Sequence, residues 1–114
     1  MLTVLNPANN TLLKEVNDDI PASISSKYAA ARSAQKTWAA TPLKERIACL
    51  QRFRALVADR MEPLAKTLTS EMGKPIRQAR NELNGLLPRI DFFCDSVAGS
   101  IQHEALATEG ETHE

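Results

Sequence analysis

Two helical patterns meet at the stretch Thr67-Leu68-Thr69-Ser70-Glu71-Met72-Gly73-Lys74-Pro75. Upstream, apolar residues recur every three to four positions over residues 63–72, and a glycine followed closely by a proline is typical of a helix end. Downstream, Pro75 opens a longer apolar pattern that keeps helical period to about Gly99. The stretch therefore predicts a short helix, a tight turn and a long helix.

The long helix is expected to continue through an internal proline, Pro88. The proline ring removes the hydrogen bond to the carbonyl of Asn84, which favours a kink. We expect no break, because the apolar stripe keeps its phase across the proline. The stripe consists of Ile76, Ala79, Leu83, Leu86, Leu87, Ile90, Phe93, Val97 and Ile101.

Two further helices are expected before this pair. The first covers residues 22–38 and carries on one face Ile24, Tyr28, Ala31 and Trp38. The second begins at Thr41-Pro42, because threonine is a favoured N-cap and proline suits the first helical position. It weakens near Pro63. Its apolar stripe consists of Leu43, Ile47, Leu50, Val57 and Met61, widened by Phe53 and Leu56.

One charged residue, Arg54, falls within the stripe of the second helix. Its guanidinium either has a partner in the core or reaches water at the end of its aliphatic stem. We favour the second interpretation, since long basic side chains commonly extend to the surface in this way.

The N-terminus predicts a β-hairpin. Residues 2–5 and 11–16 are rich in strand-forming side chains, and Asn6-Pro7-Ala8-Asn9-Asn10 between them suits a turn. A lone hairpin is marginal in water, so this one is expected to pack on another element. The predicted fold class is therefore mostly α, with about four helices and a short N-terminal β-hairpin.

The composition is that of one small soluble domain. The chain has 114 residues, of which 43% are hydrophobic, and its 14 basic and 14 acidic residues leave no net charge. Balanced charge argues against nucleic-acid binding, and no apolar run approaches the roughly 18 residues of a membrane span. We expect no nucleic acid or membrane partner and a cytoplasmic location. Residues 1–100 should form the folded unit and residues 101–114 a polar, disordered tail.

The two cysteines have structural interpretations. Cys49 and Cys94 lie within apolar helical runs, which indicates buried thiols rather than nucleophiles. A metal site that joins them to His103 or His113 matches no known ligand spacing, so we expect no metal site.

The remaining polar groups also suggest no reaction centre. Asp18 and Asp19 are interpreted as turn and capping groups. Four scattered glycines form no phosphate-binding loop. The arginines of the second helix alternate with acidic residues, which favours ion-paired faces. We therefore predict no catalytic, cofactor-binding or metal-binding residue in this chain.

Five short motifs occur in a specific order. They are Asn6-Pro7-Ala8; Ala29-Ala30-Ala31-Arg32 with Trp38; Thr41-Pro42-Leu43-Lys44-Glu45-Arg46; Glu71-Met72-Gly73-Lys74-Pro75; and Gln78-Ala79-Arg80-Asn81-Glu82. In the same order they resemble the first hairpin turn, the first helix, the start of the second helix, the E-x-G-K-P segment and the acidic helical position after it in NAD(P)-dependent aldehyde dehydrogenases. The resemblance covers residues 4–98 and is closest to semialdehyde dehydrogenases of the succinate-semialdehyde type.

Four positions depart from the pattern of that family. Gln35 stands where members commonly carry an aromatic residue, Arg54 where a small residue is usual, and Pro88 in a helix that normally has no proline. An acidic residue that helps to bind a monovalent cation in some members would fall near Ala98, so this cation site is not expected here.

The resemblance implies a fold and a role. In that family the segment is a hairpin with helices attached to the cofactor domain of an α/β fold. The catalytic cysteine, the general-base glutamate, the asparagine of a P-W-N segment and the cofactor loop lie downstream of the matched region, so Cys49 and Cys94 are not assigned to catalysis. We expect an N-terminal fragment of an enzyme that oxidises an aldehyde to a carboxylate with NAD or NADP, inactive and without bound cofactor on its own.

The apolar helix faces have two expected partners, the remainder of the aldehyde dehydrogenase chain or a second copy of this chain. The alternative to the fragment hypothesis is a self-contained helical interaction module without enzymatic activity. Such a module would bind another protein through the stripe on its long helix.

Overall fold

The computed structural model describes residues 1–102, 104, 108–109 and 112–113. Within this part of the chain the elements are β1 (Leu2–Leu5), β2 (Leu12–Val16), α1 (Pro21–Ala40), α2 (Leu43–Asp59), α3 (Met61–Met72), α4 (Ile76–Ser100), β3 (Thr108–Glu109) and β4 (Thr112–His113). The predicted fold class, mostly α with four helices and an N-terminal hairpin, is confirmed. Across the described residues no helix is long and apolar enough to cross a bilayer.

Much of the expected tail lies outside the described residues, which omit 103, 105–107, 110–111 and 114. The short strands β3 and β4 pair antiparallel. The division into a folded unit over 1–100 and a disordered tail over 101–114 therefore stays a prediction.

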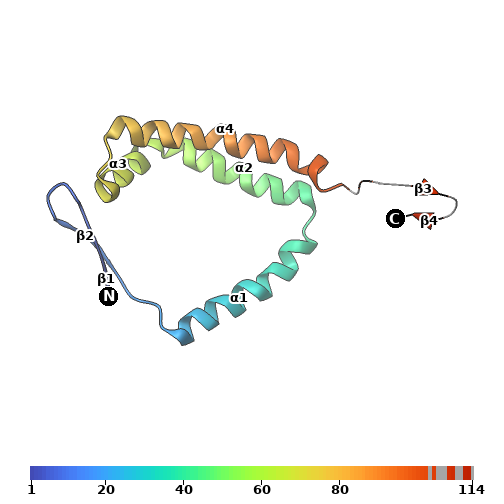
Figure 1. The fold of residues 1–114 in the computed structure, drawn as a ribbon, viewed down its shortest axis with the longest axis horizontal. Helices are drawn as coiled ribbons and strands as arrows, with labels where there is room; N and C mark the ends of the chain where they lie inside the picture. The colour runs from blue at the N-terminus through green and yellow to red at the C-terminus, as the bar shows by residue number, and fades with distance from the viewer. Residues whose placement is uncertain (103, 105–107, 110–111, 114) are drawn as a thin grey trace.

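Helices α2 and α4 form the centre of the fold. They run antiparallel and side by side, and α3 packs against one end of α4 (Figure 1). The buried hydrophobic residues of the described chain belong to these three helices: Val57 and Cys94 are each 7% exposed, and Ala65 and Ala79 are 0% exposed. Ala65 and Ala79 have small side chains, which allow the helices to approach closely. The core between the helices is therefore narrow.

Helix α1 lies apart from that centre (Figure 1). None of its residues is buried, and its apolar side chains Ile24, Tyr28 and Trp38 are 56%, 66% and 44% exposed. The predicted apolar face thus forms and stays uncovered. The whole chain exposes 9492 Å², whereas a compact monomer of the same mass exposes about 6,200 Å².

The hairpin has the predicted strands and turn. Leu2 pairs with Val16, and the register shifts by one residue between Val4 and Leu5. The turn is stabilised by the side-chain oxygen of Asn6, which accepts a hydrogen bond from the backbone N–H of Ala8 at 2.9 Å. Asn10 adopts a positive φ of 58°, a conformation that asparagine tolerates well.

Two predicted helix boundaries are wrong. Thr41 is not the N-cap of α2, because its Oγ1 donates to the carbonyl of Thr37 at 2.9 Å and so completes the end of α1. The break between α2 and α3 falls at Arg60, ahead of Pro63. Pro63 offers no N–H to the carbonyl four residues earlier and its ring clashes with it, so the preceding helix must end first. Pro63 itself lies in the first turn of α3, where backbone N–H groups have no helical partner.

The long helix α4 is continuous through Pro88, as the phase of its apolar stripe predicts. Gly73 adopts the left-handed conformation at the end of α3, with φ 71° and ψ 10°, which confirms the predicted helix stop.

Candidate functional site

The turn between α3 and α4 brings two of the sequence motifs into contact. A Cβ atom added to Gly73 would lie 2.8 Å from Cγ of Pro7, so the hairpin turn packs directly on this glycine. Only glycine suits position 73, because the backbone there has a positive φ and Pro7 leaves no room for a side chain. The hairpin therefore packs on another element, as expected.

Charged residues of the same motifs form ion pairs around the turn. Lys74 pairs with Glu82. Arg80 of α4 donates two hydrogen bonds to the carboxylate of Glu62 on α3, from Nε at 2.9 Å and from a terminal nitrogen at 2.6 Å. The hydrogen bonds from Arg80 lower the pKa of Glu62, and those to Glu62 raise the pKa of Arg80. These residues hold α3 against α4 and need no catalytic role.

A second bidentate ion pair joins α2 to α4. Arg54 donates from Nε to one carboxylate oxygen of Asp91 at 2.9 Å and from a terminal nitrogen to the other at 3.0 Å. Arg54 therefore has a partner, which the favoured interpretation lacked, but this partner is not in the core: the side chains of Arg54 and Asp91 are 35% and 47% exposed. The hydrogen bonds to Asp91 raise the pKa of the Arg54 guanidinium. Asp91 directly follows Ile90 of the apolar stripe, and this was the sequence signal for a partner on the facing helix.

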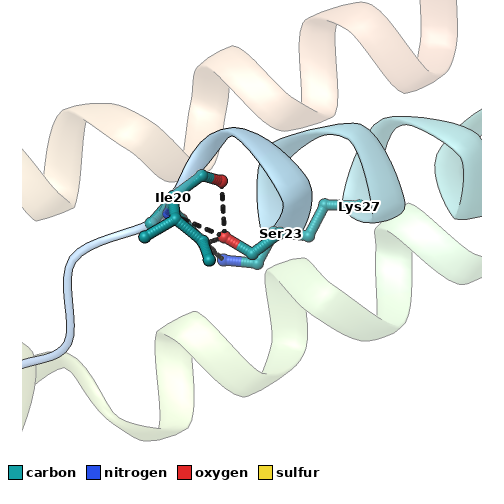
Figure 2. A network of polar contacts seen from close by, with 4 residues as sticks. Ile20, Ser23 and Lys27 are labelled. Carbon is teal, nitrogen blue, oxygen red and sulfur yellow. Dashed lines mark hydrogen bonds and ion pairs between the residues drawn. The ribbon is translucent and has the colours of Figure 1, made fainter.

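The start of α1 carries a compact polar network, shown in Figure 2. Oγ of Ser23 accepts a hydrogen bond from the backbone N–H of Ile20 at 3.0 Å and lies 2.7 Å from Oδ1 of Asp19. Nζ of Lys27 donates to both carboxylate oxygens of Asp19 at 2.6 Å. The hydrogen bond from Lys27, and then that from Ser23, lower the pKa of Asp19. The backbone at this helix start is capped by Ser23, whereas Asp19 accepts only from side chains, so Asp19 is not the capping group that was predicted.

An apolar groove of about 390 Å³ lies where the end of α1 meets α2 and α4. Its only charged lining residue within the described chain is Arg46, whose Nε donates to the carbonyl of Thr41 at 3.1 Å. The lining is otherwise dominated by apolar side chains, which include Trp38, Leu43, Ile47, Leu50, Phe92, Phe93 and Val97. Sequence periodicity predicted the stripes but not the groove, because the groove depends on how the three helices are placed relative to one another.

The two cysteines lie apart from any recognisable reaction centre. Cys94 is buried and lines the groove, Cys49 is half-buried on α2, and both are free thiols. The described residues contain no group of three or more His, Cys, Asp and Glu side chains that could hold a metal ion. His103 and the side chain of His113 lie outside the described part, so the predicted absence of a metal site at these histidines stays a prediction.

The described residues do not fit a dinucleotide. A pyrophosphate binds where a glycine-rich turn leads from a strand into a helix N-terminus. Of the described glycines, Gly85 and Gly99 lie inside α4 and Gly73 follows the end of α3. The start of α1, the one helix that follows a strand at short distance in this part of the chain, carries the carboxylate of Asp19, which repels a phosphate.

Comparison with known proteins identifies the family. The sequence profile of the Aldehyde dehydrogenase family matches residues 1–114. The chain is 33% identical over 91 residues to N-succinylglutamate 5-semialdehyde dehydrogenase 2 of Caulobacter vibrioides, which covers 80% of this chain and 19% of that protein. It is 35% identical over 94 residues to 3-sulfolactaldehyde dehydrogenase of Pseudomonas putida, or 82% of this chain and 19% of the relative.

A third relative is 3,6-anhydro-alpha-L-galactose dehydrogenase of Streptomyces coelicolor, with 34% identity over 91 residues, 80% of this chain and 18% of that protein. The chain thus spans about a fifth of the length of these curated relatives. The hairpin turn that packs on Gly73 and the ion pairs around it coincide with the motifs that first suggested the resemblance. Together with the profile match, they lead to one conclusion: the chain belongs to the aldehyde dehydrogenase family.

Proposed function

We propose that this chain is the N-terminal section of an enzyme that oxidises an aldehyde to a carboxylate and transfers a hydride to NAD or NADP. The profile match over residues 1–114 is the observation that carries the proposal. The aldehyde carbon loses the hydride to the nicotinamide, and water supplies the second carboxylate oxygen. This chain contributes a scaffold, while the nucleophile, the base and the cofactor site come from polypeptide outside the printed sequence.

The uncovered apolar surface supports a role as one section of a larger enzyme. The face of α1 and the groove beside it have the composition of an interior, yet Tyr28 and Phe92 are 66% and 63% exposed. Monomeric proteins rarely expose continuous apolar surface of this kind. The self-contained interaction module is not favoured, because the family match extends along the whole chain.

We further propose that the substrate is an aldehyde with a second, acidic group. Two of the relatives are named for such aldehydes, a semialdehyde of succinylglutamate and a sulfolactaldehyde. We also propose that the protein is located in the cytoplasm. The free thiols of Cys49 and Cys94 suit a reducing compartment.

The test begins with the native polypeptide. An antibody raised against the chain isolates from cells every polypeptide that carries this sequence, and mass spectrometry gives its length. The isolated protein is then assayed for NADH and NADPH formation with succinate semialdehyde and with butanal, a neutral aldehyde of the same chain length. The 114-residue chain alone serves as the inactive control.

We expect a polypeptide several times longer than this chain that reduces NAD or NADP only when aldehyde is present. Succinate semialdehyde should be preferred over butanal by at least about 10-fold in kcat/KM. A long polypeptide without aldehyde-dependent reduction would overturn the proposed activity. Equal use of both aldehydes would overturn the substrate class alone.

A further inference from the structure

We propose that the fold contains a hinge, formed where the break between α2 and α3 lies beside residues 84–88 of α4. The hinge divides the helical centre into two units. The hairpin unit consists of the N-terminal hairpin, α3 and residues 76–83 of α4, and the groove unit consists of α2 and residues 89–100 of α4. The proposal goes beyond the proposed function, because it concerns how this section of chain bends and depends on no reaction.

Residues 84–88 have the lowest intrinsic helix stability in α4. Pro88 has no N–H to donate to the carbonyl of Asn84, and its ring crowds that carbonyl. Gly85 adds backbone freedom, and nothing lies within 4 Å of a Cβ atom built on it. Sharp helix kinks occur mostly at such residues. The helix is continuous through this stretch, yet this is where it bends most easily.

The layer that faces α4 has its own discontinuity at Arg60. Arg60 ends α2 and precedes α3 with φ −110° and ψ 21°, which lies outside the helical range, and no side chain caps either helix there. Pro63 has no N–H to donate to the carbonyl of Asp59. A proline thus interrupts the backbone hydrogen bonding of both layers.

Two ion pairs hold these discontinuities at the same level. They are the bidentate pairs Arg54–Asp91 and Glu62–Arg80. Arg60 lies between the two pairs in one layer, and residues 84–88 lie between them along α4. Because α4 runs antiparallel to both α2 and α3 (Figure 1), the break in one layer faces the weak stretch in the other.

The contacts between elements leave the two units free to move against each other. Helices α2 and α3 each pack mainly on α4 and scarcely on one another, so α4 sets the angle between them. Each of the two ion pairs lies within one unit. Across the part of the chain that the structure describes, no side-chain hydrogen bond or ion pair joins one unit to the other. Packing contacts are non-directional, so they resist a small change of angle less than paired ions would.

Bending at the hinge changes the direction of the hairpin without altering the groove. Pro7 packs on Gly73, so the hairpin moves together with α3. The described lining of the groove comes from the end of α1, from α2 and from residues 92–100 of α4, and none of it belongs to the hairpin unit. The hinge thus lets the hairpin adjust its angle while the groove keeps its shape for the polypeptide that covers it.

Residual dipolar couplings of the backbone amides, measured on the weakly aligned 114-residue chain, test the proposal. Two units that move against each other align to different degrees, so each unit needs its own alignment tensor. We expect two tensors in the unchanged chain and one in the double variant Gly85→Ala, Pro88→Ala, which restores a regular helix. Circular dichroism checks that the helix content is kept. A single tensor in the unchanged chain, or two tensors in the double variant, would overturn the proposal.

Gly99→Ala is the matched control for position. Gly85 and Gly99 both lie in α4, and nothing lies within 4 Å of a Cβ atom added to either, so alanine favours the helix at both. Gly85→Ala alone should reduce the difference in alignment between the units, whereas Gly99→Ala should leave it unchanged. Equal effects of the two variants would overturn the proposal. The couplings are measured without aldehyde or cofactor, so failure of the hinge is distinguishable from failure of the proposed function.

Discussion

Two halves of the molecule contrast in what surrounds their helices. In α2, α3 and α4 the apolar stripes meet, and Val57, Ala65, Ala79 and Cys94 are buried. In the hairpin and α1 no residue is buried, although the two strands pair and the helix runs unbroken over 20 residues. The local sequence pattern is therefore sufficient to form a helix or a strand, whereas burial determines which helices and strands stabilise one another.

The contrast has a physical basis in the sequences of the two halves. Helix α1 contains many alanines, which have the highest helix propensity, so its helical shape needs little tertiary support. An isolated helix is nevertheless only marginally stable in water, because most helical stability in proteins comes from packing. The half that contains α1 is thus expected to depend on a partner, whether that is more of the enzyme or a second copy.

The largest expected effect comes from filling the narrow core. Ala79→Leu places three extra carbon atoms at a position that is 0% exposed between packed helices. We expect a loss of about 1–3 kcal/mol in the free energy of unfolding, measured by urea denaturation. The matched change Ala30→Leu on exposed α1 should alter it by less than about 0.5 kcal/mol. Similar losses in both variants would contradict the division into two halves.

The contact between the halves at the hairpin turn should show the next largest effect. Gly73→Ala forces a side chain into a left-handed conformation and against Pro7, and the backbone strain alone costs about 1–2 kcal/mol. Gly85→Ala is the control, because nothing lies within 4 Å of its added Cβ. That change should raise the free energy of unfolding by about 0.5–1 kcal/mol, since alanine suits a helix interior better than glycine. If both variants lose stability, the account of the turn is wrong.

A smaller loss is expected from the ion pair between α2 and α4. Arg54→Met leaves Asp91 without its bidentate partner, but both side chains are partly exposed, at 35% and 47%. The loss should be below that of Ala79→Leu and should shrink as salt concentration rises. Arg52→Met, an exposed position two residues away, is the control. The pair has no role if Arg54→Met and Arg52→Met give the same urea midpoint at low salt.

The smallest expected effect is the change in stability with pH that the Glu62–Arg80 pair contributes. The pKa of Glu62 is lowered below its ordinary value of 4.5 by Arg80, so the unfolded chain binds the proton more readily than the folded chain. The stability contributed by this pair is present above about pH 4.5 and is lost as pH falls toward the lowered pKa. Urea midpoints measured between neutral and acidic pH should therefore decline less in Glu62→Gln than in the unchanged chain. Identical declines would show that Glu62 does not contribute to the loss of stability at acidic pH.

Asp19 should respond in the same direction but only locally. Its pKa lies below the ordinary 3.8 because Lys27 and Ser23 donate to its carboxylate. Protonation weakens the start of α1 as pH falls, without changing the helices that contain the core. Amide resonances of the first turn of α1, compared with those of α4 in the same titration, would reveal the difference.

The elements themselves were predictable from the sequence, whereas several contacts were not. The hairpin, the stop at Gly73 and the continuity of α4 through Pro88 follow from local chemistry that acts over a few residues. The role of Thr41 was missed, because the same hydroxyl can cap a following helix or close a preceding one.

Contacts between distant residues required the packed structure. The partner of Arg54 is Asp91, 37 residues away, and which position of α4 faces α2 depends on the angle and offset of two helices. The contact of Pro7 with Gly73 has the same origin. At the candidate site, the sequence predicted apolar stripes and no reaction centre, whereas the groove depends on how Trp38 of α1 and the stripes of α2 and α4 are placed in space.

Native-state hydrogen exchange of the 114-residue chain tests the central contrast most directly. Amides over residues 22–36 of α1, away from the groove, should exchange at least about 100-fold faster than those in the middle of α4, because local opening there uncovers no packed side chain. Equal protection of α1 and α4 would contradict the account, since it would mean that α1 shares the core of the other three helices.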